Sequence, residues 1–199
     1  RPKIGRHSTK RVCFHQLAAP LLRGAFLEIA PGVAVCSPEL VFVQLAETLP
    51  MGELIALGYE FCGCYPLEAN RSGALVRAQL TTPARLSAFV NRVERMKGLR
   101  KARIAVQFVY AKSASAKETE MDALLMTPMR WGGLSLPPAL ANEPVALSEE
   151  AARIARGDRV VCDLLWPQAR VAAEYDGLAF HGGRHQQARD SRRRDALIA

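Results

Sequence analysis

Two carboxylates, Asp163 and Glu174, have the most informative spacing in the chain because they lie in two short apolar segments, RVVCDLLW and VAAEYD. The four residues Pro167-Gln-Ala-Arg170 join the segments, and two apolar runs around a proline-led turn are typical of a β-hairpin. If the turn is centred between Gln168 and Ala169, paired residues have numbers that add to 337, as Asp163 and Glu174 do. The sequence therefore predicts two acids that face each other across a strand pair.

Opposed carboxylates with Cβ atoms about 4.5 to 5.5 Å apart repel each other, so this pair needs a counter-charge. Mg²⁺ accepts one or two protein carboxylates, keeps several waters and leaves positions for phosphate oxygens. Alternation along the strand places Asp176 on the same face as Glu174. We therefore predict that Asp163 and Glu174 bind Mg²⁺ or Mn²⁺, with Asp176 beside them. The alternative is a solvent-facing acid, which a slip of one residue in the register would produce.

A longer pattern surrounds these acids: the chain reads Asp163-x(10)-Glu174-Tyr-Asp176-Gly-Leu-Ala-Phe-His181 and then Asp190-x-x-Arg193-x-x-x-Leu197. This pattern resembles an uncharacterised bacterial family related to the very-short-patch-repair endonucleases, within the PD-(D/E)XK superfamily. The resemblance implies an α/β fold with a restriction-endonuclease-like core, in which helices flank a central mixed sheet. It also implies Mg²⁺-dependent hydrolysis of phosphodiester bonds, with Asp163 and Glu174 as the metal ligands.

The same resemblance gives roles to three further residues. Asp176 stands where the superfamily commonly has a lysine, but the short-patch-repair relatives also work without that lysine and with a histidine near the site. His181 is then a candidate general base, since histidine titrates near neutral pH; packing beside Phe180 or bonding to Asp176 explains it equally well. Glu118 matches an acid near the start of the family's first core helix, although a capping box with Ser115 is the alternative.

Four arginines follow the acids: Arg184, Arg189, Arg192 and Arg193. We predict that they bind nucleic acid, because helical spacing would place the last three on neighbouring turns, where guanidinium groups can hold successive phosphates. Ion pairs with Asp190 and Asp195 in an ordinary surface helix are the equal alternative.

The elements that must position these residues fall into two predicted domains, a mostly helical basic domain at 1–110 and a restriction-endonuclease-like domain at 111–199. Serine, threonine and proline at helix starts and glycine or proline at helix ends predict helices. The predicted helices cover 37–49, 51–61, 82–97 and 115–127. Residues 100–110 fit either a helix or a strand, and we favour a helix. The next twenty residues are rich in glycine and proline, so we expect them to form a connection.

The net charge of +8 is unevenly distributed along the chain. Residues 71–117 carry eleven basic side chains against Glu94 alone, whereas residues 31–70 carry five acids and no base. A local basic block is the electrostatic footprint expected of a DNA-binding protein, although a solvated helix face produces the same pattern.

Residues 1–110 also resemble, through Val35-Cys-Ser-Pro-Glu-Leu and the residues up to Ala46, the middle region of abortive-infection type IV antitoxin proteins. That resemblance implies a toxin or another defence-system partner.

The five cysteines are an odd number and are scattered, which favours reduced thiols and a cytoplasmic protein. Cys62-Gly-Cys64 could supply half of a zinc site, but no second pair completes it. No run of 18 apolar residues occurs, so we expect no membrane partner. The chain begins with Arg1 and ends inside a predicted helix, which suggests a piece of a longer protein.

The sequence as a whole predicts a metal-dependent DNA endonuclease in a repair or phage-defence setting. A DNA-binding or antitoxin-like regulator that has lost the chemistry is the first alternative, and a protein-interaction module is the second. Strong salt dependence of DNA binding would argue against the second, because phosphate contacts release counterions.

Overall fold

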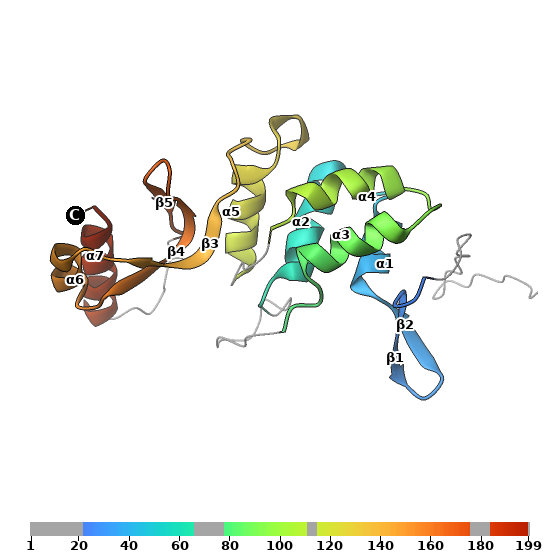
Figure 1. Cartoon of the computed structure of the whole chain (residues 1–199), viewed down its shortest axis with the longest axis horizontal. Helices are drawn as coiled ribbons and strands as arrows, with labels where there is room; N and C mark the ends of the chain where they lie inside the picture. The colour runs from blue at the N-terminus through green and yellow to red at the C-terminus, as the bar shows by residue number, and fades with distance from the viewer. Residues whose placement is uncertain (1–21, 66–77, 111–114, 176–183, 199) are drawn as a thin grey trace, which may run out of the picture.

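The computed structural model describes residues 22–65, 78–110, 115–175 and 184–198, with the side chains of the last segment described from Ser191 onward. Within these ranges the chain is mixed α/β, with seven α-helices and two small antiparallel sheets of two and three strands (Figure 1). None of the helices in these ranges is both long enough and apolar enough to cross a membrane.

The first half of the chain consists of a β-hairpin followed by four helices. The hairpin was not predicted, whereas the helices begin close to their expected positions. Serine and threonine caps explain those starts: the Ser37 side chain accepts a hydrogen bond from the Leu40 amide, and Thr82 accepts one from Arg85. The elements are β1 (Phe26–Ala30), β2 (Val33–Cys36), α1 (Pro38–Leu45), α2 (Met51–Cys62), α3 (Pro83–Arg92) and α4 (Leu99–Ala105), followed by the short 3₁₀ helix η1 (Val106–Phe108).

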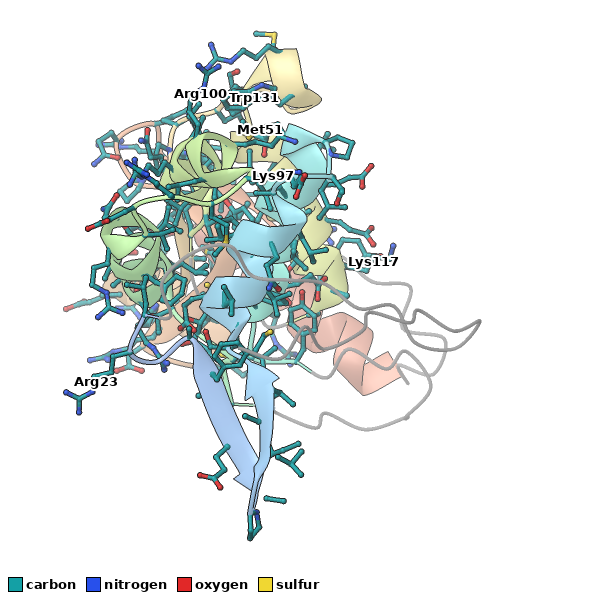
Figure 2. All side chains as sticks on the ribbon, turned by 90° about the vertical axis from the view of Figure 1, so that its right-hand side faces the viewer. Arg23, Met51, Lys97, Arg100, Lys117 and Trp131 are labelled. Carbon is teal, nitrogen blue, oxygen red and sulfur yellow. The ribbon has the colours of Figure 1, made fainter. Side chains whose placement is uncertain are left out.

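The hairpin β1–β2 projects from the helices (Figure 2). Its large apolar side chains are exposed on both strands, namely Phe26, Leu27, Ile29, Val33 and Val35. Strands β1 and β2 form their own two-stranded sheet, separate from the sheet that carries the predicted acids.

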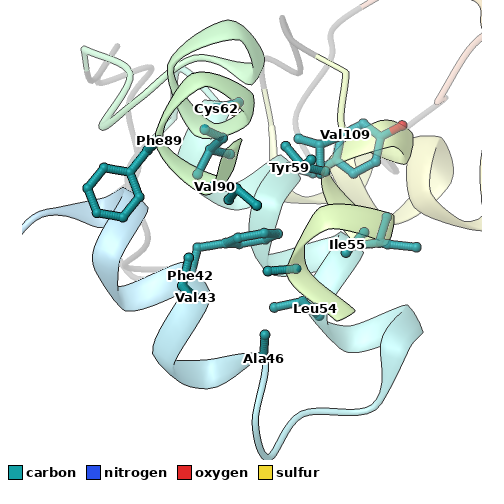
Figure 3. Packing of buried hydrophobic residues seen from close by; sticks show 14 of the residues in the cluster. Phe42, Val43, Ala46, Leu54, Ile55, Tyr59, Cys62, Phe89, Val90 and Val109 are labelled. Carbon is teal, nitrogen blue, oxygen red and sulfur yellow. The ribbon is translucent and has the colours of Figure 1, made fainter. Parts of the chain in front are cut away.

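The hydrophobic core lies where helices α1 to α4 meet. Figure 3 shows the ring of Phe42 among Val90, Leu54 and Ile55, and all four side chains are fully buried. The same buried cluster continues through Met126, Ala141, Leu164 and Trp166. Strand β4 (Arg159–Trp166), which carries Asp163, therefore packs against the helical core through Leu164 and Trp166.

Helix α3 ends earlier than predicted, at Arg92 instead of beside Gly98. Gly98 instead precedes α4, where its φ of 78° is in the left-handed region. A Cβ atom at this position would lie 2.4 Å from the Glu47 amide nitrogen. The glycine that was expected to stop one helix thus allows the chain to pass closely over the end of α1 and begin the next helix.

Several of the basic residues in this half bind the protein itself. The Lys101 ammonium donates to the Leu49 carbonyl at 2.7 Å, and Arg103 donates to the Val93 carbonyl at 2.8 Å. Lys97 pairs with Glu47 at 3.1 Å. The side chains of Lys97 and Arg100 lie on the surface (Figure 2). Part of the basic block therefore stabilises helix ends, and part is displayed to solvent.

The second half places a three-stranded antiparallel sheet, in the order β3-β4-β5, between α5 and the pair α6 and α7 (Figure 1). The sheet was expected to be mixed, but in the described residues every strand pairing is antiparallel. The elements are α5 (Ala116–Met126), the 3₁₀ helix η2 (Met129–Trp131), β3 (Leu140–Ala146), α6 (Glu149–Ala155), β4 (Arg159–Trp166), β5 (Val171–Ala173) and α7 (Arg184–Ile198).

The prediction that the residues after Pro128 only connect other elements was wrong, because β3 lies in that stretch. Asn142 and Pro144 made the segment resemble a turn. Strand β3 is at the edge of the sheet, where a missing N–H is tolerated, and Asn142 takes a left-handed conformation with φ 51° inside the strand. Helix α6, which Ser148 caps through the Ala151 amide, was also not predicted.

Candidate active site

The β4–β5 hairpin has the predicted register. Its observed pairs are Leu164 with Ala173, Leu165 with Ala172 and Trp166 with Val171, and each pair of numbers adds to 337. Glu174 follows β5 directly, and one step further in the same register would set it opposite Asp163. The even-numbered side chains of β4 are buried while Asp163 points to the other, partly open face. Strand alternation anchors β4 to the core and leaves its acid accessible.

Asp163 is held by the backbone of the strand that follows the turn. Its Oδ2 atom accepts a hydrogen bond from the Tyr175 amide at 2.7 Å. Burial raises the pKa of the Asp163 carboxyl above its ordinary value, and the negative charge of Glu118 raises it further. The hydrogen bond from Tyr175 and the charge of Arg193 act in the opposite direction. The carboxylate is therefore fixed in place but poorly neutralised.

Glu118 reaches the site from the first turn of α5. Its amide donates to the Ser115 side chain at 3.1 Å, which confirms the predicted helix cap. Its Oε2 atom accepts from the Asn142 side chain at 3.1 Å. The β3–β4 register on either side of Asn142 places this residue across from Asp163. The helix cap and the role at the site are thus compatible, since the backbone caps the helix while the carboxylate turns toward the strands.

Glu174 has a cationic partner. The Arg193 Nη2 atom of α7 lies 2.6 Å from its Oε2 atom, and the two side chains are 39% and 35% exposed. Burial raises the pKa of the Glu174 carboxyl and the nearby Asp163 adds to this, while Arg193 and a hydrogen bond from the Cys162 thiol lower it. The Cys162 thiol has a raised pKa in turn, mainly through burial. Glu118, Asp163, Glu174, Cys162 and Arg193 thus form one electrostatically linked group.

The remaining predicted site residues are only partly covered by the structure. Asp176 and His181 lie outside the described residues. Arg184 and Arg189 belong to α7, and their side chains are outside the described part. Arg192 is partly buried on the same helix. Arg193 pairs with Glu174, a partner that was not predicted, and the prediction that it binds nucleic acid stays a prediction.

Three participants were missed by sequence reasoning: Asn142, Cys162 and the ion pair of Arg193. Asn142 could not be placed because β3 itself was not predicted. Cys162 precedes Asp163 directly and lies on the opposite, buried face of β4, and no role was predicted for it. The end of β5 at Ala173 leaves the Glu174 side chain free to reach it. The signal for Arg193 was present in the Asp190-x-x-Arg193 spacing but indicated no partner.

Comparisons with protein-family models, curated proteins and solved structures find no match for this chain.

The donor set suits a small hard cation. Within residues 22–65, 78–110, 115–175 and 184–198, no three Asp, Glu, His or Cys side chains are grouped closely enough to hold a metal ion. Mg²⁺, however, often uses only one or two protein carboxylates and completes its shell with water. Asp163 and Glu174 are candidates for such a pair: burial raises the pKa of both carboxyls, and Arg193, which pairs with Glu174, compensates for part of their negative charge.

Proposed function

We propose that this chain is a Mg²⁺-dependent phosphodiesterase that cleaves DNA, built on a restriction-endonuclease-like core. The observation that carries the proposal is the β4–β5 register: continued by one step beyond the Leu164–Ala173 pair, it would set Asp163 opposite Glu174, and the charge of Asp163 acts on Glu174. The element order α5, β3, α6, β4, β5, α7 supports a core in which a three-stranded antiparallel sheet is flanked by helices. The exposed basic residues of α3 and α4 support a role in binding DNA.

The described residues of the site have distinct roles in this proposal. Asp163 and Glu174 would hold the cation, and the amide of Tyr175 keeps the Asp163 carboxylate oriented. Glu118 and Asn142 orient each other beside Asp163. When bound, a divalent cation stabilises negative charge on a phosphate and lowers the pKa of bound water. The proton acceptor is assigned to His181 or Asp176, as the family resemblance suggests.

The helix that carries Glu118 also carries an exposed cation. Lys117, in the first turn of α5, is exposed and pairs with Glu120 at 2.6 Å. Its charge also interacts with Tyr175, the residue whose amide donates to Asp163. A cation in that place can attract a phosphate backbone without competing for the acids themselves.

The test is cleavage of supercoiled plasmid in Mg²⁺ or Mn²⁺ by the full chain and by matched variants. Asp163→Asn and Glu174→Gln should each lower cleavage by more than about 100-fold, because even outer partners of metal ligands cost roughly 10- to 100-fold. Asp158→Asn and Glu149→Gln are the controls, since these acids are 92% and 95% exposed and neither belongs to the group around Asp163. Equal cleavage by Asp163→Asn and Asp158→Asn would refute the proposal.

One observation favours a second candidate, a DNA-binding regulator that keeps the core without the chemistry. Glu174 is already neutralised by Arg193, which is what a degenerate site would contain. A regulator would bind DNA with strong salt dependence, and it would not cleave DNA in either Mg²⁺ or Mn²⁺. Its DNA affinity would be the same in the Asp163→Asn variant, so the plasmid assay combined with a binding assay separates the two candidates.

A further inference from the structure

Arg193 is fixed against the acid pair by more than one contact. Its Nη2 atom donates to Glu174 Oε2 at 2.6 Å and also to the Val161 carbonyl of β4. The Nε atom is buried and makes no hydrogen bond within the described part of the chain. One nitrogen of the guanidinium is therefore held by two acceptors, Val161 of β4 and Glu174, which follows β5, while the Nε donor is unused.

The charge of Arg193 acts on the whole site. It lowers the pKa of Asp163 and of Glu174, and it lowers that of Cys162 as well. A divalent cation bound by Asp163 and Glu174 would lie close to the Glu174 oxygen that the Arg193 guanidinium already contacts. Two positive groups on one carboxylate repel each other, so both cannot keep their full attraction to Glu174.

We propose that Arg193 is the built-in counter-ion of the acid pair and that it competes with the divalent cation for Glu174. Cation binding then breaks the Arg193–Glu174 ion pair. The bond to the Val161 carbonyl keeps the freed guanidinium beside the site, where its donors suit a phosphate oxygen. This inference rests on the proposed function, since it assumes that Asp163 and Glu174 bind the cation.

The competition also affects helix α7. The ion pair ties α7 to the β4–β5 hairpin, which is otherwise distant from it in the sequence. If cation binding breaks the Arg193–Glu174 ion pair, α7 loses one of its contacts with the hairpin, and the last turns of α7 should become less stable. A cation-bound site would then present Arg193 to DNA, whereas the cation-free site keeps it paired.

Equilibrium titration with Mn²⁺ tests the competition without any reaction being catalysed. Calorimetry should be carried out on the full chain, on Arg193→Gln and on Arg192→Gln, which removes the same charge from the adjacent position of α7. Arg193→Gln should bind Mn²⁺ about fivefold more tightly than the unmodified chain, or about 1 kcal/mol, as expected for losing a partly exposed competing pair. Arg192→Gln should stay within about twofold of the unmodified chain, because it loses charge but no competitor.

Two other results of the Mn²⁺ titration would overturn the proposals in different ways. If Arg193→Gln binds Mn²⁺ no more tightly than the unmodified chain, or Arg192→Gln gains as much, the competition is refuted while the proposed function stands. If neither the unmodified chain nor Arg193→Gln binds Mn²⁺, both proposals fail.

Hydrogen exchange of the unmodified chain gives an answer even if Arg193→Gln does not fold. Mg²⁺ should speed amide exchange in the last turns of α7, and unchanged or slower exchange in a chain that binds the cation would overturn the competition.

Discussion

The ion pair between Arg193 and Glu174 should contribute measurably to the stability of the cation-free chain. The atoms lie 2.6 Å apart, but the side chains are 39% and 35% exposed, so water screens their attraction. Unit charges about 4 Å apart attract by roughly 4 kcal/mol at an effective dielectric of 20 and by roughly 1 kcal/mol in water. Exposed pairs measured by mutation contribute about 0.2 to 1 kcal/mol. We therefore expect a coupling energy of about 1 kcal/mol.

The assay is a double-mutant cycle with Arg193→Gln, Glu174→Gln and the double variant, followed by urea unfolding with EDTA present. The cycle removes the separate cost of losing the Val161 contact, because that loss is common to both Arg193 variants. The pair of Arg153 and Glu149 is the matched control, since it is 3.7 Å apart and 79% and 95% exposed, and its coupling should be near zero. A coupling between Arg193 and Glu174 no larger than this control would refute the reasoning.

Three further outcomes follow from the structure. Asp163→Asn should raise the melting temperature in EDTA at pH 7, because the pKa of Asp163 is raised in the folded chain, which therefore loses stability as the pH rises through that pKa. The gain in melting temperature should shrink toward pH 4. A gain that stays constant with pH, or a loss, in a fluorimetric pH series would contradict this prediction. Gly98→Ala should lower the free energy of unfolding in urea by about 1 to 3 kcal/mol, since φ is 78° and the added Cβ meets the Glu47 amide; an unchanged midpoint would contradict this. Cys62 should resist alkylation at pH 8 while the less buried Cys36 reacts, because burial raises the pKa of Cys62 to about 12; equal labelling of the two peptides by mass spectrometry would be inconsistent with the packing.

The hairpin and the helix caps were predictable because their signals are local. Alternating burial and a four-residue turn fix the β4–β5 register from a few neighbouring residues, and Ser37, Thr82 and Ser115 mark three of the helix starts through their own side chains. The mixed α/β class followed from the same elements.

The remaining elements depend on contacts that are distant in sequence. Strand β3 contains Asn142 and Pro144, and only its position at the sheet edge makes these residues acceptable. The contact of Arg193 with Glu174 crosses 19 positions and depends on where α7 docks. Tertiary packing, not local preference, decides both, so the counter-ion of the acid pair could not be read from the spacing that revealed the pair.

The most direct test of the central claim is whether Asp163 and Glu174 together bind a divalent cation. Electron paramagnetic resonance of free Mn²⁺ during titration counts the ions bound to the full chain and to each acid variant. We expect one Mn²⁺ per chain, affinity weakened by more than about tenfold in both Asp163→Asn and Glu174→Gln, and unchanged affinity in Asp158→Asn. Binding that is equally strong in Asp163→Asn, or absent from the unmodified chain, would contradict the account.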